Sequence, residues 1–345
     1  MADARTILVT GGCGFIGSNF VKMLVAEEPS VTIVNLDALT YAGNLSNLAE
    51  ELENSRHRFV HGDINDRDLV SELIRNDGIS GIINIAAETH VDRSITEPEA
   101  FVTSNVLGTV SLLQEAHANG IERFLQVSTD EVYGDLGADG IFREDSLIRP
   151  NSPYSASKAG GDHFVHAYHH THGLNTGITR CSNNYGPYQF PEKMIPLMFN
   201  NARGDIPLPV YGDGLQVRDW LYVDDHCRAI WAAYCHGRPG EIYNVGGGNE
   251  MTNLDVVGLI LGYLGKPESL VQHVTDRPGH DRRYAIDAGK IEQALGWGPV
   301  VTFEVGIRKT LDWYASNQEW LDSMTSGAYR TYYEEMYAGR GRGEG

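Results

Sequence analysis

Tyr154 and Lys158, in the stretch YSASK, are the side chains best placed by type and spacing to perform chemistry. They lie four positions apart in a segment expected to form a helix that starts after Pro153, so both share one face. A phenol with a pKa of about 10 is a poor base at neutral pH, but a neighbouring ammonium favours the phenolate. Tyr154 could then take the proton of an alcohol. Such a pair also occurs by chance on many helices, so its surroundings must support it.

Two adjacent acids form a second candidate group. In VSTDEVYG, residues 127–134, Asp130 and Glu131 follow a run that is typical of a buried strand ending in Ser128 and Thr129. An acid pair after a strand is usually a solvated turn, and that interpretation stays open for these two residues taken alone.

A glycine-rich turn indicates a dinucleotide site. In LVTGGCGFIGSNF, Gly11, Gly14 and Gly17 stand between a predicted strand and a predicted helix, which lets the backbone approach a pyrophosphate at the helix N-terminus. Asp37 ends the next predicted strand and could accept hydrogen bonds from a ribose diol, which favours NAD over NADP. The oxidised nicotinamide would favour the phenolate of Tyr154 and accept the hydride of the alcohol carbon. The alternative is an ordinary strand–helix turn followed by a surface Asp.

The elements that must position these residues alternate along the chain. Short β-rich runs at residues 6–12, 32–37, 58–63, 81–87 and 123–129 are each followed by a stretch with helical spacing, and two more runs lie at 175–186 and 241–247. This pattern predicts an α/β fold with a doubly wound parallel sheet of the Rossmann type. Asp63 and the run Ala86, Ala87 and Glu88 end the third and fourth strands, where such sheets bind ligands.

The second half is expected to interleave sheet strands with a smaller C-terminal lobe. The predicted NAD-binding domain comprises residues 1–184 and about 226–250, and the predicted substrate lobe comprises about 185–225 and 251–330. The Gly-rich end, residues 338–345, is expected to be a flexible tail.

The composition excludes several classes of function. The chain has 345 residues, 41% of them hydrophobic, and a formal net charge of -19, so it can bury a sizeable core but repels nucleic acid and acidic membranes. No signal-type apolar core or membrane-spanning run is found, which predicts a soluble cytoplasmic protein. The four cysteines, Cys13, Cys181, Cys227 and Cys235, have neither disulfide nor CxxC spacing.

The glycine turn and the Tyr-x-x-x-Lys pair resemble the extended short-chain dehydrogenase/reductases. Seven further stretches, in order, resemble the dTDP-glucose 4,6-dehydratase family within them: LDALTYAGN, AAETHVDRSI, VSTDEVYG, PYSASKA, NNYGPYQFPEK, RDWLYVDDH and DRPGHDRRYAID. The resemblance runs from residue 7 to about residue 297. Cys13, Thr89 and Ser104 replace the Ala, Ser and Thr usual at these positions, and each keeps size or hydroxyl chemistry.

The resemblance implies why two acids are needed. A dehydratase must remove the C5 proton and expel the C6 hydroxyl after Tyr154 and NAD+ have oxidised C4. The resemblance assigns Glu131 as the base for the C5 proton and protonated Asp130 as the acid for the C6 hydroxyl. Hydride then returns to C6, so NAD+ is recycled and can stay tightly bound. The product is a 4-keto-6-deoxy sugar nucleotide for deoxysugar biosynthesis. Adjacent acids in opposite protonation states require different environments.

The resemblance also implies the residues of the site. The catalytic set is Thr129, Asp130, Glu131, Tyr154 and Lys158. The cofactor set is Gly11, Gly14, Phe15, Ile16, Gly17, Asp37, Leu39, Thr40, Asp63, Ile64, Ala86, Ala87 and Ser104, with Tyr154 and Lys158. The substrate set is Thr89, Thr129, Asn183, Glu192, Lys193, Leu208, Pro209, Val210, Tyr211, Arg218, Asn253, Arg277, His280 and Tyr284. Arg218 and Arg277 would hold the diphosphate, although surface pairing of these arginines, and of Arg282 and Arg283, with nearby acids is the alternative.

Other functions remain to be separated from this one. An epimerase or decarboxylase shares NAD, Tyr154 and Lys158 but does not need the acid pair, and a non-catalytic NAD-binding regulator is possible on the same fold. Five histidines between His163 and His172 are expected on a helix face, and no metal site is expected. The resemblance implies a homodimer. It does not decide whether the base of the nucleotide-sugar substrate is thymine or uracil.

Overall fold

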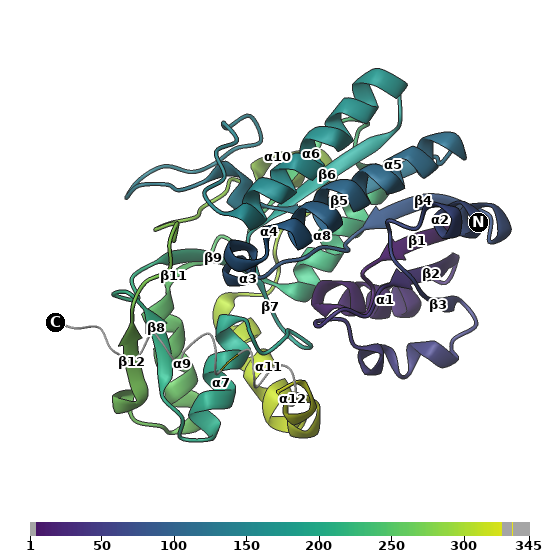
Figure 1. Ribbon diagram of the computed structural model, residues 1–345. Helices are drawn as coiled ribbons and strands as arrows, with labels where there is room; N and C mark the ends of the chain where they lie inside the picture. The colour runs from purple at the N-terminus through teal and green to yellow at the C-terminus, as the bar shows by residue number, and fades with distance from the viewer. Residues whose placement is uncertain (1–4, 326–332, 334–345) are drawn as a thin grey trace.

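A seven-stranded parallel sheet forms the centre of the computed structural model, which describes residues 5–325 and residue 333 (Figure 1). The predicted tail at 338–345 lies outside the described residues. The strands of the central sheet are β1 (Arg5–Thr10), β2 (Val31–Asp37), β3 (His57–His61), β4 (Ile79–Asn84), β5 (Arg123–Thr129), β6 (Thr176–Cys181) and β10 (Ile242–Val245). The strand order is β10-β6-β5-β4-β1-β2-β3. The predicted fold class, an α/β fold with a doubly wound parallel sheet, is confirmed.

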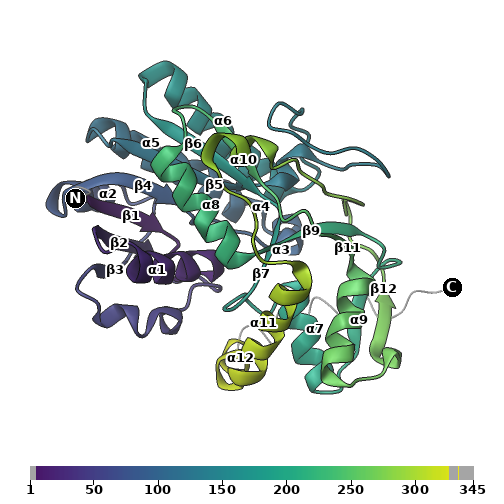
Figure 2. The ribbon, with the colours of Figure 1, turned by 180° about the vertical axis from the view of Figure 1, so that it is seen from behind.

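Helices cover both faces of this sheet because successive strand residues point to opposite sides. Ile7 and Val9 of β1 pack in one apolar cluster with α1 (Phe15–Glu27), α8 (Val223–His236) and α10 (Gly289–Leu295). Figure 2 shows α1 and α8 on this face of the sheet. Leu8 between them packs in another cluster with α2 (Arg67–Asn76), α5 (Thr109–Ala118) and α6 (Pro153–His172). Strands buried on both faces explain the nearly continuous apolar runs in the sequence.

Short helices connect the sheet to the site. After β4 come α3 (Val91–Thr96), α4 (Pro98–Phe101) and a π-helical turn, η3 (Val102–Gly108), which leads into α5. The 3-10 turns are η1 (Leu45–Leu48), η2 (Glu51–Glu53), η4 (Asp130–Tyr133) and η5 (Glu268–Leu270). Turn η4 continues β5 directly, so the acid pair stands at the carboxyl end of a central strand.

The later part of the chain forms a smaller lobe with its own apolar core. The lobe has a three-stranded sheet of β7 (Asn183–Tyr185), β9 (Val217–Tyr222) and β11 (Glu250–Thr252), and a parallel pair of β8 (Leu208–Tyr211) and β12 (Val271–Val274). Its helices are α7 (Met194–Arg203), α9 (Asn253–Leu264), α11 (Phe303–Ser316) and α12 (Gln318–Met324). Buried aromatic rings, among them Tyr185, Trp220 and Tyr314, fill its core. Between β9 and β11 the chain returns to the large sheet as α8 and β10.

None of the described helices combines the length and apolar character that crossing a membrane requires. The four cysteines are unpaired thiols, and three of them are buried.

Candidate active site

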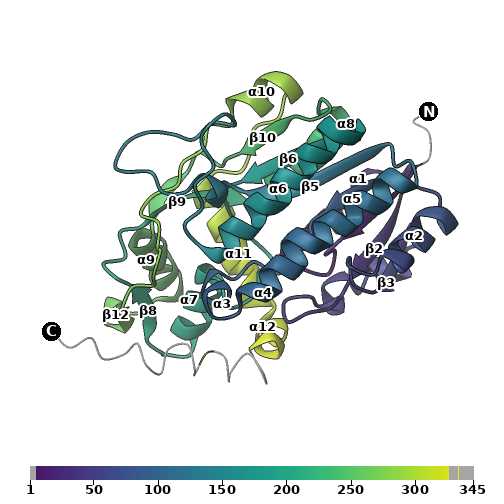
Figure 3. The ribbon, with the colours of Figure 1, turned by 45° about the horizontal axis from the view of Figure 1, so that its top comes forward.

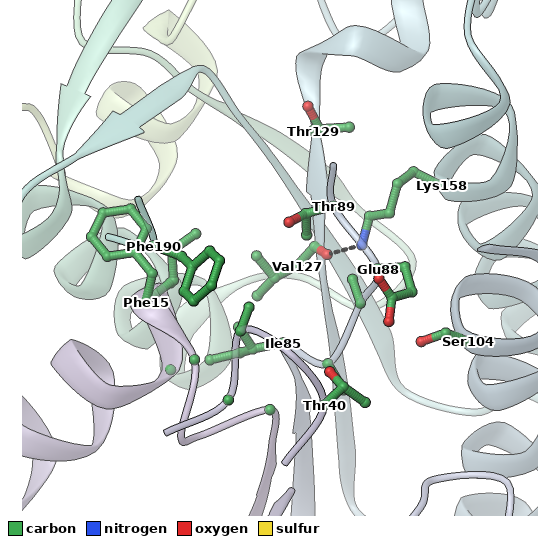
Figure 4. A pocket seen from close by; sticks show the side chains of 18 of the residues that line it. Phe15, Thr40, Ile85, Glu88, Thr89, Ser104, Val127, Thr129, Lys158 and Phe190 are labelled. Atoms are coloured by element: carbon green, nitrogen blue, oxygen red, sulfur yellow. Dashed lines mark hydrogen bonds between the residues drawn. The ribbon is translucent and has the colours of Figure 1, made fainter. Parts of the chain in front are cut away.

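A cavity of about 520 Å³ opens at the carboxyl ends of β1, β4 and β5. Its volume lies in the range of small-molecule sites. The strand order reverses between β1 and β4, and open α/β sheets bind ligands at such a switch point. Figure 4 shows Thr129 at one end of the cavity and Thr40 at the other, with Lys158 and Glu88 between them.

The glycine turn forms one wall of this cavity. Gly11 has a positive φ of 69°, and a Cβ atom there would lie only 2.7 Å from the backbone of Ala86. A Cβ atom on Gly17 would lie 2.0 Å from the carbonyl oxygen of Gly11, so α1 packs against the turn only with glycine. No side chain caps α1 at Gly14, and the first residues of the helix line the cavity. Such an N-terminus fits the pyrophosphate of a dinucleotide.

Asp37 is fixed at the far end of the cavity by backbone donors. Its carboxylate accepts hydrogen bonds from the N–H groups of Cys13 and Leu39, both at 2.8 Å. Burial raises the pKa of Asp37, while these two hydrogen bonds act to lower it. Leu39 itself is absent from the cavity lining, and its side chain packs on the apolar cluster beside α1. Its place in the predicted cofactor set is therefore that of a backbone donor to Asp37.

The structure brings most predicted site residues to this one cavity. The lining includes the predicted cofactor residues Gly11, Gly14, Phe15, Ile16, Gly17, Asp37, Thr40, Asp63, Ile64, Ala86, Ala87, Ser104, Tyr154 and Lys158. It also includes Thr89, Thr129, Asp130, Glu131, Asn183, Glu192 and Lys193 from the predicted catalytic and substrate sets. Residues from both parts of the fold thus meet at one site.

Helix α6 presents Tyr154 and Lys158 to the cavity. It begins with a capping box, in which the side chains of Ser152 and Ser155 bond each other's backbone N–H groups, and Pro153 occupies its first turn. Lys158 is buried, and its Nζ atom donates a 2.8 Å hydrogen bond to the carbonyl of Val127 on β5. Burial lowers the pKa of Lys158, although the Asp162 carboxylate acts in the opposite direction.

The protein's own groups hold Tyr154 protonated. Burial and the neighbouring Glu131 raise the pKa of Tyr154 well above 10, and a hydrogen bond with the Thr129 hydroxyl only partly opposes them. Lys158, one helical turn further along α6, directs its ammonium to the carbonyl of Val127. That a neighbouring ammonium and an oxidised nicotinamide together favour the phenolate of Tyr154 stays a prediction.

Asp130 and Glu131 lie side by side in different surroundings. Asp130 is buried, and among the described residues its Oδ2 atom has no hydrogen-bond partner. Burial, then Glu131 and Asp219, raise the pKa of Asp130 well above its ordinary value. The Thr129 hydroxyl lies 3.4 Å from Asp130 Oδ1, and it also accepts the backbone N–H of Glu131 at 3.3 Å.

Glu131 is surrounded by cations. Burial raises its pKa, but Arg277, Arg218 and Lys193 all act to lower it. The two adjacent acids thus differ in the sign of their main charged neighbours, which are carboxylates for Asp130 and cations for Glu131. This is the arrangement in which one carboxyl stays protonated while the other ionises.

The lobe places three more of the predicted substrate residues near Glu131: Arg218, Arg277 and Tyr284. The guanidinium carbon of Arg218 lies 4.4 Å from the ring centroid of Tyr284, and its nitrogens donate to the carbonyls of Val217 and Asp281 at 2.8 and 2.9 Å. Arg277 Nη1 lies 3.6 Å from Asp92 Oδ2. Arg218, Tyr284 and Arg277 all interact electrostatically with Glu131 or with each other, so they extend the site beyond the cavity wall.

The predicted base-binding residues form a more distant set. Leu208 and Val210 of β8 point into the apolar core of the lobe, so a ligand could reach them only through their backbone. The ring of Tyr211 lies 6.0 Å from that of His280, whose pKa is lowered to about 4 by burial, Arg277 and Arg218. Pro209 is buried in the same strand, and Asn253 begins α9 with its N–H on the carbonyl of Gln216 at 3.1 Å. None of these residues lines the cavity described above.

Surface pairing, the alternative considered for the arginines, holds for two of them. Arg282 Nη1 lies 2.7 Å from Asp213, and Arg283 Nε lies 2.6 Å from Glu250. Both hydrogen bonds are largely exposed, so these arginines do not join the site.

Asn105 is a site-supporting residue that sequence reasoning missed. This buried side chain on η3 accepts the N–H of Glu88 and donates to its carbonyl, both at 2.9 Å. It also donates to Ser157 on α6 at 2.8 Å. Asn105 therefore ties the loop after β4 to the helix that carries Tyr154. No local pattern in the sequence marks it.

The histidines from His163 to His172 lie on α6, as expected. The rings of His166 and His170 are tilted by 60° to each other, with centroids 4.4 Å apart. Within the described part of the chain, no group of three or more His, Cys, Asp or Glu side chains is arranged to hold a metal ion.

Comparison with known proteins agrees with this geometry. The family model of GDP-mannose 4,6 dehydratase matches residues 8–310. The dTDP-glucose 4,6-dehydratase of Xanthomonas campestris pv. campestris (strain B100) is 54% identical over 94% of this chain and 97% of its own length. The dTDP-glucose 4,6-dehydratase of Streptomyces venezuelae, solved with NAD and TDP bound, is 50% identical with a TM-score of 0.91, covering 93% of this chain and 100% of that chain. That of Bacillus anthracis, solved with NAD, is 48% identical with a TM-score of 0.88, covering 93% and 100% of the two chains.

Proposed function

This chain belongs to the dTDP-glucose 4,6-dehydratases, within the GDP-mannose 4,6-dehydratase family, and from that premise we propose that it converts dTDP-glucose to dTDP-4-keto-6-deoxyglucose and water. The observation that carries the proposal is the acid pair: Asp130, with its raised pKa, and Glu131, among cations, share one cavity with Tyr154. An epimerase has no use for two such groups. The product would serve deoxysugar biosynthesis.

The residues of the cavity fit an NAD cofactor. The glycine turn admits a pyrophosphate, and the Asp37 carboxylate can accept a ribose diol. When bound, NAD+ would supply the redox chemistry, as an acceptor for the hydride of C4 and, once reduced, the hydride donor for C6. The positive charge of its nicotinamide would favour the phenolate of Tyr154, whose pKa burial and Glu131 raise.

Tyr154 and the acid pair would divide the proton transfers among them. Tyr154 takes the proton of the 4-hydroxyl as C4 is oxidised, which makes the proton on C5 acidic. Glu131 takes that proton, and Asp130 donates one to the departing C6 hydroxyl, which leaves as water. When hydride adds to C6, Glu131 returns its proton to C5. The sugar has then lost one water, and the cofactor is unchanged overall.

Thr129 would close the proton balance within the protein. After one turnover Tyr154 holds an extra proton and Asp130 lacks one. The Thr129 hydroxyl hydrogen-bonds the phenol of Tyr154 and lies 3.4 Å from Asp130 Oδ1. A hydroxyl is both a donor and an acceptor, so it can pass the proton from phenol to carboxylate. The enzyme is then ready for the next substrate.

The cations of the lobe would hold the substrate's diphosphate. Arg218 and Arg277 lie close enough to Glu131 to lower its pKa, and Lys193 donates to the carbonyl of Thr89 at 2.7 Å. Guanidinium groups are suited to bidentate phosphate contacts. Both arginines fall within the proposed lobe limits, about 185–225 and 251–330, although α10 in the second range packs against the large sheet.

We further propose a homodimer formed by η3, α5 and α6, which lie on one outer face of the molecule (Figure 3). The charged residues of α6, Lys158 and Asp162, are both buried, so its exposed part carries no Asp, Glu, Lys or Arg. Large apolar side chains are exposed here, Phe164 by 42% on α6 and Val102 by 48% and Leu107 by 53% on η3. Depletion of charge around apolar side chains is typical of an interface core.

The unpaired thiols fit the cytoplasm as the compartment of this protein, because thiols stay reduced there.

Incubation of the purified protein with dTDP-glucose, without added cofactor, tests the function. Mass spectrometry should show a sugar nucleotide lighter by one water, with the alkali-induced absorbance of a 4-keto-6-deoxy sugar. An unchanged mass with altered stereochemistry would support an epimerase instead. Absence of reaction with dTDP-glucose and UDP-glucose, even after NAD+ is added, would contradict the proposed substrate class.

A further inference from the structure

Tyr41 joins two loops that are distant in the sequence. It lies in the segment between β2 and η1, and its hydroxyl donates a 2.9 Å hydrogen bond to Oε1 of Glu192, 151 residues away in the segment before α7. The Glu192 side chain is almost fully buried, with 1% of its surface exposed. This hydrogen bond is therefore shielded from solvent.

Two further side chains brace the contact. The guanidinium carbon of Arg93, on α3, lies 4.1 Å from the centroid of the Tyr41 ring, and its Nε atom lies 3.4 Å from Glu192 Oε2. Phe190 packs edge-on against the same ring, with centroids 5.6 Å apart. The Tyr41 hydroxyl stays protonated at working pH, since burial and then Glu192 raise its pKa well above 10. It remains a donor.

Both joined loops are walls of the cavity. Thr40, Ala42 and Gly43, on either side of Tyr41, line it, and so do Phe190 and Lys193 on either side of Glu192. Figure 4 shows Thr40 and Phe190 on different sides of the cavity. The Tyr41–Glu192 hydrogen bond thus links the loop after β2, which follows Asp37, to the loop before α7 in the lobe.

We propose that Tyr41 is a retention residue, which keeps NAD bound through turnover by holding these two loops together. The inference rests on the proposed function, in which hydride taken from C4 must return to C6 of the same sugar. A cofactor that left between these steps would take the hydride with it and leave the 4-keto sugar unfinished. Release requires one of the two walls to move, and this breaks the hydrogen bond to Glu192.

Tyr41→Phe tests the proposal, because it removes the hydroxyl and keeps the ring against Arg93 and Phe190. The matched control is Tyr263→Phe, which removes a 2.7 Å hydrogen bond to the Asp312 carboxylate on the outside of the lobe. The cofactor content per chain is measured during repeated dilution and concentration, without substrate. Because Tyr41→Phe leaves a buried carboxyl oxygen of Glu192 without its donor, release should be about tenfold to a hundredfold faster than from the native protein. Tyr263→Phe should release at the native rate.

A second measurement follows the cofactor during turnover. Pyruvate and lactate dehydrogenase in the solution oxidise any reduced cofactor that escapes, so lactate per sugar consumed reports the escape. Lactate should form with Tyr41→Phe and not with the native protein or the control. Glu192→Asp, which shortens the acceptor, should speed release in the same direction.

Native release rates in both Tyr41→Phe and Glu192→Asp would overturn the proposal. Since the release assay needs no substrate, a protein that fails to dehydrate dTDP-glucose but loses NAD faster in Tyr41→Phe would contradict the proposed function alone.

Discussion

Lys158 donates a 2.8 Å hydrogen bond to the backbone carbonyl of Val127. This contact ties α6, which carries Tyr154, to β5 three residues before the acid pair begins, and all three residues line one cavity. The lysine therefore positions the helix as well as contributing charge. A buried ammonium without this acceptor would be costly, which is why the pairing is specific.

Glu131→Gln should separate oxidation from elimination. The amide keeps the size of the side chain but cannot take the C5 proton, so the variant should bind dTDP-glucose, reduce the cofactor and stop there. The rate of product formation should fall by about a hundredfold to ten-thousandfold. Rapid-mixing absorbance of the nicotinamide should rise and stay raised. Normal turnover would contradict the role of Glu131.

Thr129→Val and Thr129→Ser should behave differently if the hydroxyl relays a proton. Ser keeps the oxygen between Tyr154 and Asp130, whereas Val keeps the shape without it. Turnover should stay within a few-fold of native in Ser and fall by about a hundredfold in Val. The first turnover should be less affected than later ones, because Asp130 starts protonated. Equal rates in Val and Ser would rule out the relay.

Asp130→Asn should abolish dehydration and stabilise the fold. Burial raises the pKa of Asp130, so the folded state favours the protonated form and loses stability as pH rises above the ordinary pKa of this group, 3.8. Asn cannot ionise and avoids that loss. We expect a gain of about 0.5 to 2 kcal/mol at pH 7 to 8 in denaturant unfolding, and no gain near pH 4. A destabilised variant at pH 8 would contradict the raised pKa.

The fold could be predicted from the sequence because its signals are local. Seven apolar runs gave the seven strands of the central sheet, and alternate residues such as Ile7 and Leu8 face opposite layers. The glycine turn, Tyr154, Lys158 and the acid pair were also predictable, since each lies within a short stretch with a chemical use.

The supporting contacts could not be predicted, because they join segments far apart in the chain. Asn105 bonds the backbone of Glu88 and Ser157, and Tyr41 meets Glu192 only once the lobe has docked on the sheet. The partner of Lys158 was missed for the same reason: helical spacing places it near Tyr154, while the hydrogen bond goes to a strand carbonyl. Contacts of this kind depend on packing and not on spacing.

Phe164→Glu should dissociate the proposed dimer. A carboxylate on the uncharged face of α6 would meet its own copy across a two-fold axis, or be buried without a partner. Light scattering after size-exclusion chromatography should show a mass close to 38.0 kDa for the variant and about twice that for the native chain. Leu259→Glu, on α9 and equally exposed, should stay dimeric. A native protein that is already monomeric would overturn the proposed interface.

His226→Leu should flatten the loss of stability at acid pH. His226, on α8, is fully buried, and neither ring nitrogen has a hydrogen-bond partner among the described residues. Burial lowers its pKa from 6.5 to about 3, so the folded state excludes the proton that the unfolded chain binds. Its contribution to stability is therefore complete above pH 6.5 and is lost as pH falls toward 3, by up to about 1.4 kcal/mol per pH unit.

Unfolding by urea at pH 7, 6 and 5 should show a shallower decline in the free energy of unfolding for His226→Leu than for the native protein. Replacement of the exposed His236 at the end of the same helix by Gln should leave the native decline unchanged. An identical decline in His226→Leu and the native protein would mean that the buried ring is not excluded from protonation.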